Sequence, residues 1–143
     1  MLKKIQIQTS KQFEIVDITK EVLNVITEST VQQGIALIYS PHTTASIRIN
    51  HYEPLLLQDI LRAEYRLVPQ DISYNHDLFE LRANAAANER SNGHAHVKAF
   101  LLGSSESVII DSGRAVLGDR QSIWFVEFDG GRKRDCYVKI VGG

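Results

Sequence analysis

A histidine followed by two threonines stands between two predicted β-strands and is the first stretch with obvious chemical potential. The apolar run Ile35–Tyr39 precedes it and the alternating run Ala45–Asn50 follows it. Pro41 disfavours a helix at the residue before it, so the segment His42–Thr44 follows a turn. Loops carried by rigid strands often hold binding and catalytic residues. A surface histidine beside threonine, however, more often has no function.

Two further histidines, His94 and His96, lie two residues apart in a run that we predict to be a strand, His94–Leu102. Alternate residues of a strand share a face, so both imidazoles and Lys98 would point the same way. Paired imidazoles on one strand face suit a metal ion. The solvated face of an ordinary amphipathic strand would show the same pattern, and spacing alone does not separate the two.

His76 lies beside Asp77 in the polar stretch Gln70–Asp77. A neighbouring acid can orient a histidine as a metal ligand or a general base, although many such loop histidines simply face solvent. Three imidazoles with an open fourth position are a familiar catalytic metal arrangement. The sequence therefore offers His42, His76 and His96 as a hypothetical set, without a short-range spacing that ties them together.

Charged residues add two more hypotheses. Glu53 and Asp59, near the start of a predicted helix, could act as acid, base or metal contact, or could simply favour the helix N-terminus. A late basic group could bind phosphate through arginine donors or form a solvated hairpin end, and its members are Arg114, Arg120, Arg132, Lys133 and Arg134. The chain has no P-loop, Rossmann glycine fingerprint or nucleophile elbow, which argues against nucleotide binding by those routes.

The elements that must position these residues alternate irregularly between strands and helices. The predicted strands are Lys4–Thr9, Phe13–Ile18, Ile35–Tyr39, Ala45–Asn50, His94–Leu102, Ser107–Asp111, Gln121–Glu127 and Cys136–Val141. The predicted helices run from an N-cap at Thr19 to a stop at Gly34, from Pro54 to a stop before Pro69, and over Leu81–Arg90.

We expect the first two strands to pair as a hairpin, and the continuously apolar run Ile35–Tyr39 to be buried on both faces. The order of elements favours an α+β fold over a regular alternation of strand and helix. Residues 1–143 are predicted to form one domain, because no linker, repeat or low-complexity segment interrupts them.

Length, net charge and cysteine count exclude several classes of protein. The chain has 143 residues and a formal net charge of −1, which suits one core and gives no electrostatic reason to expect nucleic acid or an anionic membrane. No apolar run reaches the length of a membrane span, and the N-terminus has no signal-peptide pattern. Cys136 is the only cysteine, which excludes an internal disulfide and a cysteine-rich metal site. We therefore expect a cytoplasmic protein.

Four short motifs in this order resemble the YjbQ family, whose members are also described as secondary thiamine-phosphate synthases. The motifs are Pro41–Ser46, Asn75–Asp77, Gly93–Ala99 with Leu101–Gly103, and Gly118 with Gln121, Ile123, Trp124 and Glu127. The resemblance covers nearly the whole chain. It implies an α+β domain with a mixed, mostly antiparallel sheet folded on itself and a few helices, assembled as a homotrimer.

The resemblance also implies a pocket near the subunit boundary that contains His42, His76 and His96. A divalent metal is the expected cofactor of this pocket, and zinc is the favoured ion. Thr43, Thr44 and Ser46 match the family's hydroxyl run, and Gln121 matches its glutamine. His94 ranks below His96, because the family does not hold a histidine there. The chain departs from the family pattern at Asn50-His51, Ser91-Asn92 and Arg120-Gln121-Ser122. The candidate catalytic residues are His42, Thr43, Thr44, Ser46, Glu53, Asp59 and Gln121.

The activity implied by the resemblance is a transferase reaction. It joins the pyrimidine and thiazole halves of thiamine phosphate and releases pyrophosphate, and a histidine-bound metal could stabilise the charge on the departing group. The expected substrate is a phosphorylated small molecule, with no nucleotide cofactor. Two alternatives are metal-dependent hydrolysis of a small phosphate ester and a non-catalytic, trimeric ligand-binding protein.

Overall fold

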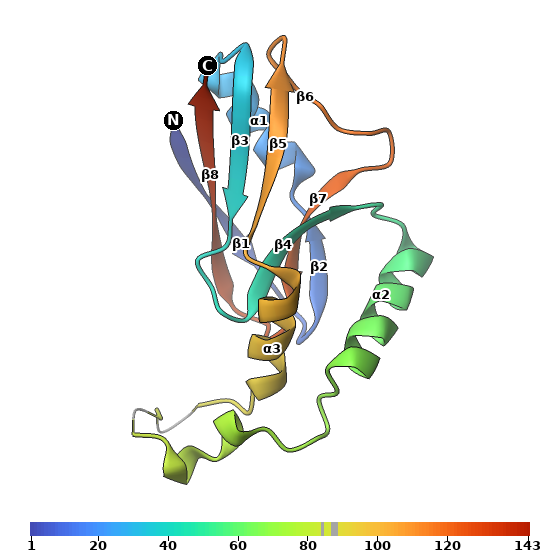
Figure 1. Cartoon of the computed structure of the whole chain (residues 1–143), viewed down its shortest axis with the longest axis vertical. Helices are drawn as coiled ribbons and strands as arrows, with labels where there is room; N and C mark the ends of the chain where they lie inside the picture. The colour runs from blue at the N-terminus through green and yellow to red at the C-terminus, as the bar shows by residue number, and fades with distance from the viewer. Residues whose placement is uncertain (84, 87–88) are drawn as a thin grey trace.

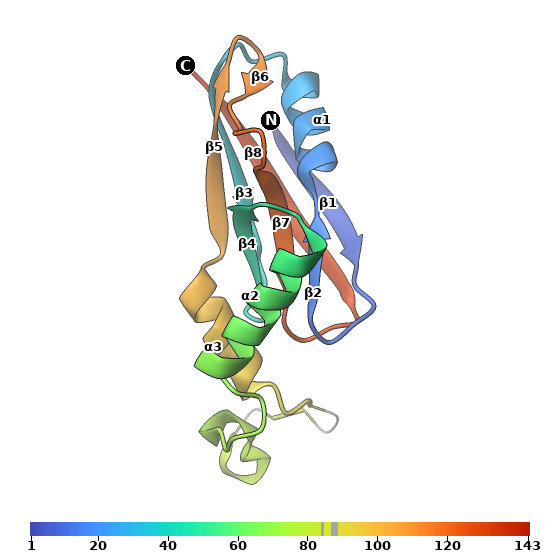
Figure 2. The same ribbon diagram turned by 90° about the vertical axis from the view of Figure 1, so that its right-hand side faces the viewer.

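The computed structural model describes residues 1–83, 85–86 and 89–143 and shows two antiparallel sheets accompanied by helices (Figure 1, Figure 2). In these residues one sheet has the order β1 (Leu2–Gln8), β8 (Lys133–Gly142), β3 (Gln33–Tyr39), β5 (Ser105–Asp111) and β6 (Arg114–Ala115). The other has the order β2 (Glu14–Asp17), β7 (Ser122–Glu127) and β4 (Ala45–Asn50). Each of these strand pairings is antiparallel. The predicted α+β class, with a mostly antiparallel sheet folded on itself, is confirmed.

The main apolar core is shared by both sheets and by helix α1 (Thr19–Ser29), which contributes Val22 and Ile26. Strand β3 sends Ala36 and Ile38 into this core, while its alternate side chains remain exposed. The prediction that Ile35–Tyr39 is buried on both faces is therefore wrong. An antiparallel sheet packs one face on the core and leaves the other available to solvent or to a partner.

The predicted hairpin between the first two strands is not formed. β1 pairs with β8, which places Ile5 opposite Cys136, and β2 pairs with β7, which places Val16 opposite Phe125. The link between β1 and β2 carries the chain from one sheet to the other. Alternation of apolar and polar residues predicts that a strand exists, but it does not identify the strand's partner.

Helix α1 begins and ends at residues other than those predicted. Thr19 is its first residue rather than its N-cap, and the Thr19 hydroxyl accepts a hydrogen bond of 2.8 Å from the main-chain nitrogen of Ile123. The helix ends at Ser29, where Thr30 adopts a left-handed conformation with a φ of 57°. Gly34 lies in β3, where an added Cβ would meet the Val141 oxygen at 2.1 Å, so close strand packing explains this glycine.

Helix α2 (Pro54–Leu67) begins where its sequence signal predicts. Pro54 is the first helical residue, and the Glu53 carboxylate accepts a hydrogen bond of 2.6 Å from the main-chain nitrogen of Leu56. The helix contributes partly buried side chains to a smaller core cluster that contains Trp124. Glu53 therefore has a structural role as the cap of this helix.

The segment predicted as the strand His94–Leu102 is instead helix α3 (Gly93–Leu102), so that prediction is wrong. Alanine, leucine and lysine favour a helix. Its buried side chains recur three and four residues apart, at His94, Ala95, Lys98 and Ala99. In a helix, His94 and Lys98 share one face, whereas His96 turns to the opposite side. The two neighbouring histidines therefore do not enter one site.

Between α2 and α3 the chain forms two short 3₁₀ turns, η1 (Asn75–Asp77) and η2 (Phe79–Leu81). The predicted helix Leu81–Arg90 is not found in the described residues of that segment, while its residues 84, 87 and 88 lie outside the described residues. Within the described ranges, no helix is both long and apolar enough to cross a membrane.

Candidate functional site

An open cleft with a volume of about 650 Å³ lies between the loop after β3, the N-terminal end of α3 and the start of β8. Its ionisable lining residues are His42, Glu89, Arg90, His96, Arg132 and Arg134. We call it the arginine cleft. Three guanidinium groups and two imidazoles share this lining with one carboxylate, so the cleft favours anionic ligands.

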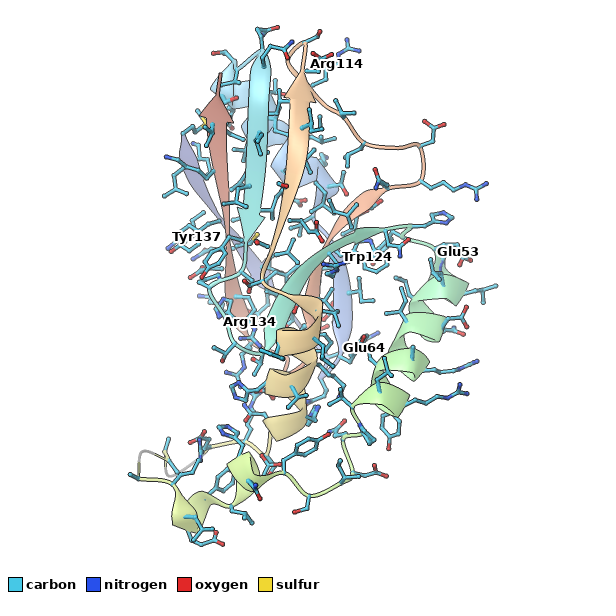
Figure 3. The ribbon with its side chains drawn as sticks, in the orientation of Figure 1. Glu53, Glu64, Arg114, Trp124, Arg134 and Tyr137 are labelled. Atoms are coloured by element: carbon cyan, nitrogen blue, oxygen red, sulfur yellow. The ribbon has the colours of Figure 1, made fainter. Side chains whose placement is uncertain are left out.

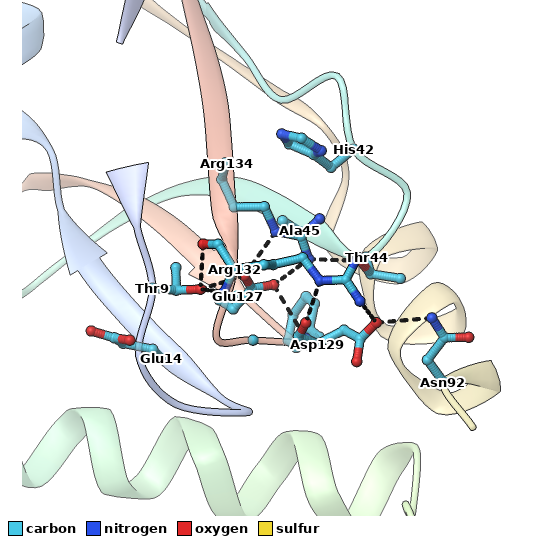
Figure 4. Close-up of polar contacts among 12 residues, drawn as sticks. Thr9, Glu14, His42, Thr44, Ala45, Asn92, Glu127, Asp129, Arg132 and Arg134 are labelled. Atoms are coloured by element: carbon cyan, nitrogen blue, oxygen red, sulfur yellow. Dashed lines mark hydrogen bonds and ion pairs between the residues drawn. The ribbon is translucent and has the colours of Figure 1, made fainter. Parts of the chain in front are cut away.

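One arginine of the cleft is held by a buried ion pair (Figure 4). The Glu127 carboxylate, at the end of β7, is fully buried, and Arg134 donates to it from Nε at 2.8 Å and again from Nη2. Thr9 also donates to Glu127 at 2.8 Å, and Arg134 donates to the Thr44 hydroxyl at 2.7 Å. A buried pair is tolerated when such surrounding hydrogen bonds satisfy both partners.

A second buried acid, Asp129, holds the other two arginines, and Figure 4 shows its contacts with Arg132 and Asn92. Arg132 donates to its carboxylate at 2.8 Å and to its main-chain oxygen at 2.9 Å. Arg90 donates to the same main-chain oxygen at 2.8 Å, and Asn92 donates to the carboxylate at 2.9 Å. Three guanidinium groups thus stand over two buried carboxylates, and Glu89 at the edge of the cleft is paired with Arg82, which leaves one formal positive charge unneutralised in front of the cleft.

His42 is oriented by the main chain of β8. Its Nε2 accepts a hydrogen bond of 2.9 Å from the main-chain nitrogen of Asp135, so in the neutral imidazole the proton resides on Nδ1. Its ring meets Phe125 edge-on, with centroids 6.4 Å apart. Burial, followed by the nearby positive charge of Arg134, lowers the pKa of His42. The imidazole is therefore neutral at physiological pH and offers Nδ1–H as a donor.

His96 stands on α3 beside His76 from η1. Their ring centroids are 4.6 Å apart and their planes are inclined by 72°. Burial, followed by the neighbouring His76, lowers the pKa of His96. Arg82 reaches His76 at 3.3 Å and binds Glu89 at 2.5 Å, which ties this histidine pair to the edge of the cleft.

The predicted three-histidine metal set converges only in part. His76 and His96 are neighbours, whereas His42 directs its Nε2 to the main chain of Asp135. Within residues 1–83, 85–86 and 89–143, no group of three or more His, Cys, Asp or Glu side chains is placed to hold a metal ion. These side chains of one chain therefore do not form a complete site, and metal binding stays a prediction.

The predicted hydroxyl residues have different positions. Thr43 lines the arginine cleft and Thr44 binds Arg134. Ser46 is fully buried and donates a hydrogen bond of 3.3 Å to the main-chain oxygen of Ala99, which joins β4 to α3. Its contacts are those of a packing residue.

Glu53, Asp59 and Gln121 do not line the arginine cleft. Glu53 caps α2, away from Arg134 in the side-chain view (Figure 3), and Asp59 is exposed on the same helix. Gln121 precedes β7, where its side-chain oxygen accepts a hydrogen bond of 2.8 Å from the main-chain nitrogen of Gly118.

Sequence reasoning missed Glu127, Asp129, Arg90 and Asn92 as site residues. A weak signal existed for Glu127, because it closes an aromatic, buried strand where an acid needs a partner. The predicted late basic group is divided by the fold: Arg132 and Arg134 line the cleft, whereas Arg114 lies at the opposite end of the sheet (Figure 3). Arg120 and Lys133 are not among the lining residues.

Fold and cleft together define an α+β protein with an arginine-lined site at one end of two antiparallel sheets. The chain matches the family described as UPF0047 protein YjbQ-like over residues 3–143. A UPF0047 protein of Methanocaldococcus jannaschii is 43% identical over 143 residues, which cover 99% of this chain and 95% of that protein. YugU of Bacillus subtilis is 41% identical over 143 residues, with coverage of 99% and 100%.

The fold is also similar to solved structures of proteins from the same family. A YbjQ-like protein of unknown function from Sulfolobus solfataricus has a TM-score of 0.91 and 34% identity, with coverage of 100% of this chain and 97% of that chain. An uncharacterised YjbQ/UPF0047 protein from Clostridium acetobutylicum has a TM-score of 0.86 and 38% identity, with coverage of 97% and 99%. The chain belongs to the YjbQ/UPF0047 family, as its motifs predict.

Proposed function

We propose that the arginine cleft binds the phosphate groups of a small substrate and that the protein is a thiamine-phosphate-synthase-like transferase. The reaction joins a pyrimidine pyrophosphate to a thiazole phosphate and releases pyrophosphate. The observation that carries this proposal is the convergence of three arginines on one cleft, beside His42 and His96. We take the type of reaction from the resemblance of the motifs to the YjbQ family. The arginine cleft adds an electrostatic environment that suits phosphate groups.

The arginines suit a departing pyrophosphate. In this reaction the bond between the pyrimidine methylene carbon and the pyrophosphate oxygen breaks, and a bond from that carbon to the thiazole nitrogen forms. Negative charge grows on the leaving group. Arg132 and Arg134 are already fixed by Asp129 and Glu127, so they can receive that charge without reorganising.

The imidazoles suit the same step. The Nδ1–H of His42 is available to donate to an oxygen of the departing pyrophosphate, since its Nε2 is occupied by Asp135. Because burial lowers the pKa of His96, that side chain is neutral and does not repel the positive charge that develops on the thiazole nitrogen.

The test is chromatographic detection of thiamine phosphate from purified, tag-free protein and both substrates, with several divalent metals and without metal. We expect Arg132→Ala to lower the rate about 100-fold, the scale of one lost electrostatic contact. Lys133→Ala is the matched control, because it removes a neighbouring exposed cation outside the cleft lining. Absence of thiamine phosphate under every condition would argue strongly against this proposal.

Hydrolysis of a small phosphate ester is the second candidate. The cleft is open to water, and the neutral imidazole of His96 could accept a proton from an attacking water molecule, while His42 donates from Nδ1 to the phosphate. A phosphatase panel with and without chelator separates this activity from the transferase. If neither activity is found, while alanine at His42, His76 or His96 alters assembly, a non-catalytic binding role gains support.

We propose that His76 and His96, together with further ligands, would hold a divalent metal ion, with zinc as the favoured ion. The close approach of their rings supports this pair, and no reaction step is assigned to the ion. Metal content of tag-free protein tests the proposal, with His76→Ala, His96→Ala and His42→Ala as variants. Loss of metal in the first two variants only would place His42 outside the ligand set.

We propose that the protein assembles as a homotrimer, because the outer face of the larger sheet carries exposed apolar side chains. Ile35 stands opposite Val141 and Ile109 in the strand register, and these side chains are 49–62% exposed. The same face carries the exposed side chains of Leu37, Tyr39 and Leu2. A continuous apolar patch of this kind commonly marks a protein interface.

Light scattering after gel filtration tests the oligomeric state. We expect wild-type protein to have three times the mass of one chain and Ile35→Glu to shift toward the monomer. Leu55→Glu is the control, because Leu55 is 67% exposed on α2 and lies outside this face. A monomeric wild-type protein would remove the trimer from the proposal.

A further inference from the structure

A small cavity between helices α2 and α3 has no part in the proposed reaction. Its volume is about 40 Å³, and among the described residues none lines both this cavity and the arginine cleft. The two spaces lie on opposite sides of α3, because His94 and Lys98 share one face of the helix and His96 occupies another. We call it the lysine cavity, after Lys98 in its wall.

Three ionisable side chains from the two helices are buried around the lysine cavity. Glu64 on α2 is 8% exposed, and His94 and Lys98 on α3 are 3% and 4% exposed. The Lys98 amine donates a hydrogen bond of 2.8 Å to Nδ1 of His94, so the imidazole carries its own proton on Nε2. Glutamate and lysine are rarely buried this deeply unless they are paired or have a function.

Two polar atoms of this group have no hydrogen-bond partner among the described residues. They are Nε2 of His94 and Oε2 of Glu64. A buried polar group without a partner lowers stability, so such groups need an explanation in each case. A donor, an acceptor and an amine around one small space are the groups that a reacting carbonyl compound requires.

The rest of the cavity wall limits what can enter. The rings of Phe13 and Phe128, with centroids 5.6 Å apart, supply an apolar side. Leu61, Tyr65 and Gln70 line the cavity and are exposed, so they mark its opening to solvent. One water molecule takes up about 30 Å³, so the cavity has room for a molecule of about two or three non-hydrogen atoms.

We propose that Lys98 is a nucleophile that forms an imine with an aldehyde of one or two carbons in the lysine cavity, with His94 and Glu64 as the groups that move protons. This is a second reactive site, and it does not depend on the proposed transferase activity. Lys98 reacts from its neutral fraction, as lysines in general do.

The step releases one molecule of water and involves no oxidation. The Lys98 nitrogen forms a bond to the aldehyde carbon and loses a proton to His94. Glu64 then gives a proton to the hydroxyl of the adduct, which leaves as water while the carbon–nitrogen double bond forms. The proton that His94 gains balances the one that Glu64 gives. Burial raises the pKa of Glu64, which suits a carboxyl group that donates a proton.

Carbon dioxide is the competing partner for a buried amine, because it is equally small. Its product with Lys98 is a carbamate, which adds a negative charge to a cavity that already holds the Glu64 carboxyl group. An imine adds no negative charge, and its formation uses the acid that Glu64 provides. The composition of the cavity therefore favours the aldehyde.

The experiment treats the intact protein with acetaldehyde and sodium cyanoborohydride, which reduces an imine to a stable ethylamine. Peptide mass spectrometry follows each lysine with time. We expect Lys98 to be ethylated at least about tenfold faster than the exposed Lys4, because proton transfer by its neighbours outweighs its burial. Benzaldehyde should modify Lys4 but not Lys98, since an aromatic ring is larger than the cavity.

Variants test the role of the acid. Glu64→Gln should slow ethylation of Lys98 at least about tenfold and leave that of Lys4 unchanged. Glu21→Gln, at an exposed position on α1, is the matched control and should change neither rate. Melting curves by circular dichroism check that each variant is folded.

Three outcomes would overturn the proposal. If Lys98 reacts no faster than Lys4, or Glu64→Gln leaves its rate unchanged, the buried group is a packing feature. If benzaldehyde modifies Lys98 as readily as acetaldehyde does, the reaction follows separation of the helices rather than binding in the cavity. If added bicarbonate suppresses ethylation of Lys98 but not of Lys4, carbon dioxide is the partner.

Discussion

Replacing Glu127 by glutamine tests whether the buried acid organises the arginine cleft. The carboxylate accepts hydrogen bonds from Arg134, from the Thr9 hydroxyl and from the main-chain nitrogen of Asp129. A glutamine amide keeps the shape but replaces one acceptor oxygen with a donor. That donor would face another N–H or O–H group, and the guanidinium of Arg134, 4% exposed, would lose its counter-charge.

The expected loss of stability is large. Removing one partner of a buried ion pair costs about 3–5 kcal/mol, because the remaining charge stays out of water. For a chain of this length we expect the melting temperature to fall by about 10–20 °C. Urea unfolding followed by circular dichroism measures the free energy directly, and an unchanged slope against urea would show that the same surface is exposed on unfolding.

Two variants sharpen the result. Glu106→Gln makes the same substitution in a surface pair, where Arg48 lies 2.8 Å from Glu106 and is 47% exposed, and it should cost no more than about 1 kcal/mol. The double variant Glu127→Gln/Arg134→Met removes the unpaired charge and should be more stable than Glu127→Gln alone. A cost below about 1 kcal/mol for Glu127→Gln, or a double variant no more stable than Glu127→Gln, would show that the buried carboxylate does not hold Arg134 in this way.

Three further outcomes are expected. Burial lowers the pKa of His42 and of His96, so as the pH falls these histidines bind protons in the unfolded chain before they do so in the folded chain. The melting temperature should therefore fall as the pH drops below about 6.5. Melting curves of His42→Gln recorded at several pH values should show a weaker dependence on pH. Burial raises the pKa of Cys136 to about 12, so a thiol reagent near pH 8 should label it only after unfolding in urea. Glu53→Ala removes the cap of α2 and should cost about 1 kcal/mol in urea unfolding, whereas a neutral result would contradict the cap.

Local signals in the sequence predicted many of the helices and strands, but they did not identify which strands pair. The alternation around Ile5 and the Glu53-Pro54 start signal identified β1 and α2 because both depend on neighbouring residues. The pairing of β1 with β8 joins residues at opposite ends of the chain, which no local pattern encodes. The order of the elements favoured the α+β class, and the family resemblance implied the mostly antiparallel sheet folded on itself.

The segment around His96 shows how one wrong period changes a site. The alternation of polar and apolar residues there fits a strand, but alanine and leucine content favours the helix that forms. As a strand, it would have grouped both histidines. As a helix, it buries His94 against Lys98 at 2.8 Å and leaves His96 to the cleft. The ranking of His96 above His94 came from the family motif rather than from spacing.

Net charge also misleads about the cleft. The chain has 16 basic and 17 acidic residues, and its formal charge of −1 gives no indication of an anion site. The fold places Glu127 and Asp129 beneath the arginines, so those acids fix the guanidinium groups without occupying the mouth of the cleft. A local excess of one positive charge in a partly buried, low-dielectric site attracts a phosphate more strongly than a diffuse excess spread over the surface. Binding chemistry therefore follows from where the acids are buried, which depends on long-range strand pairing rather than on composition.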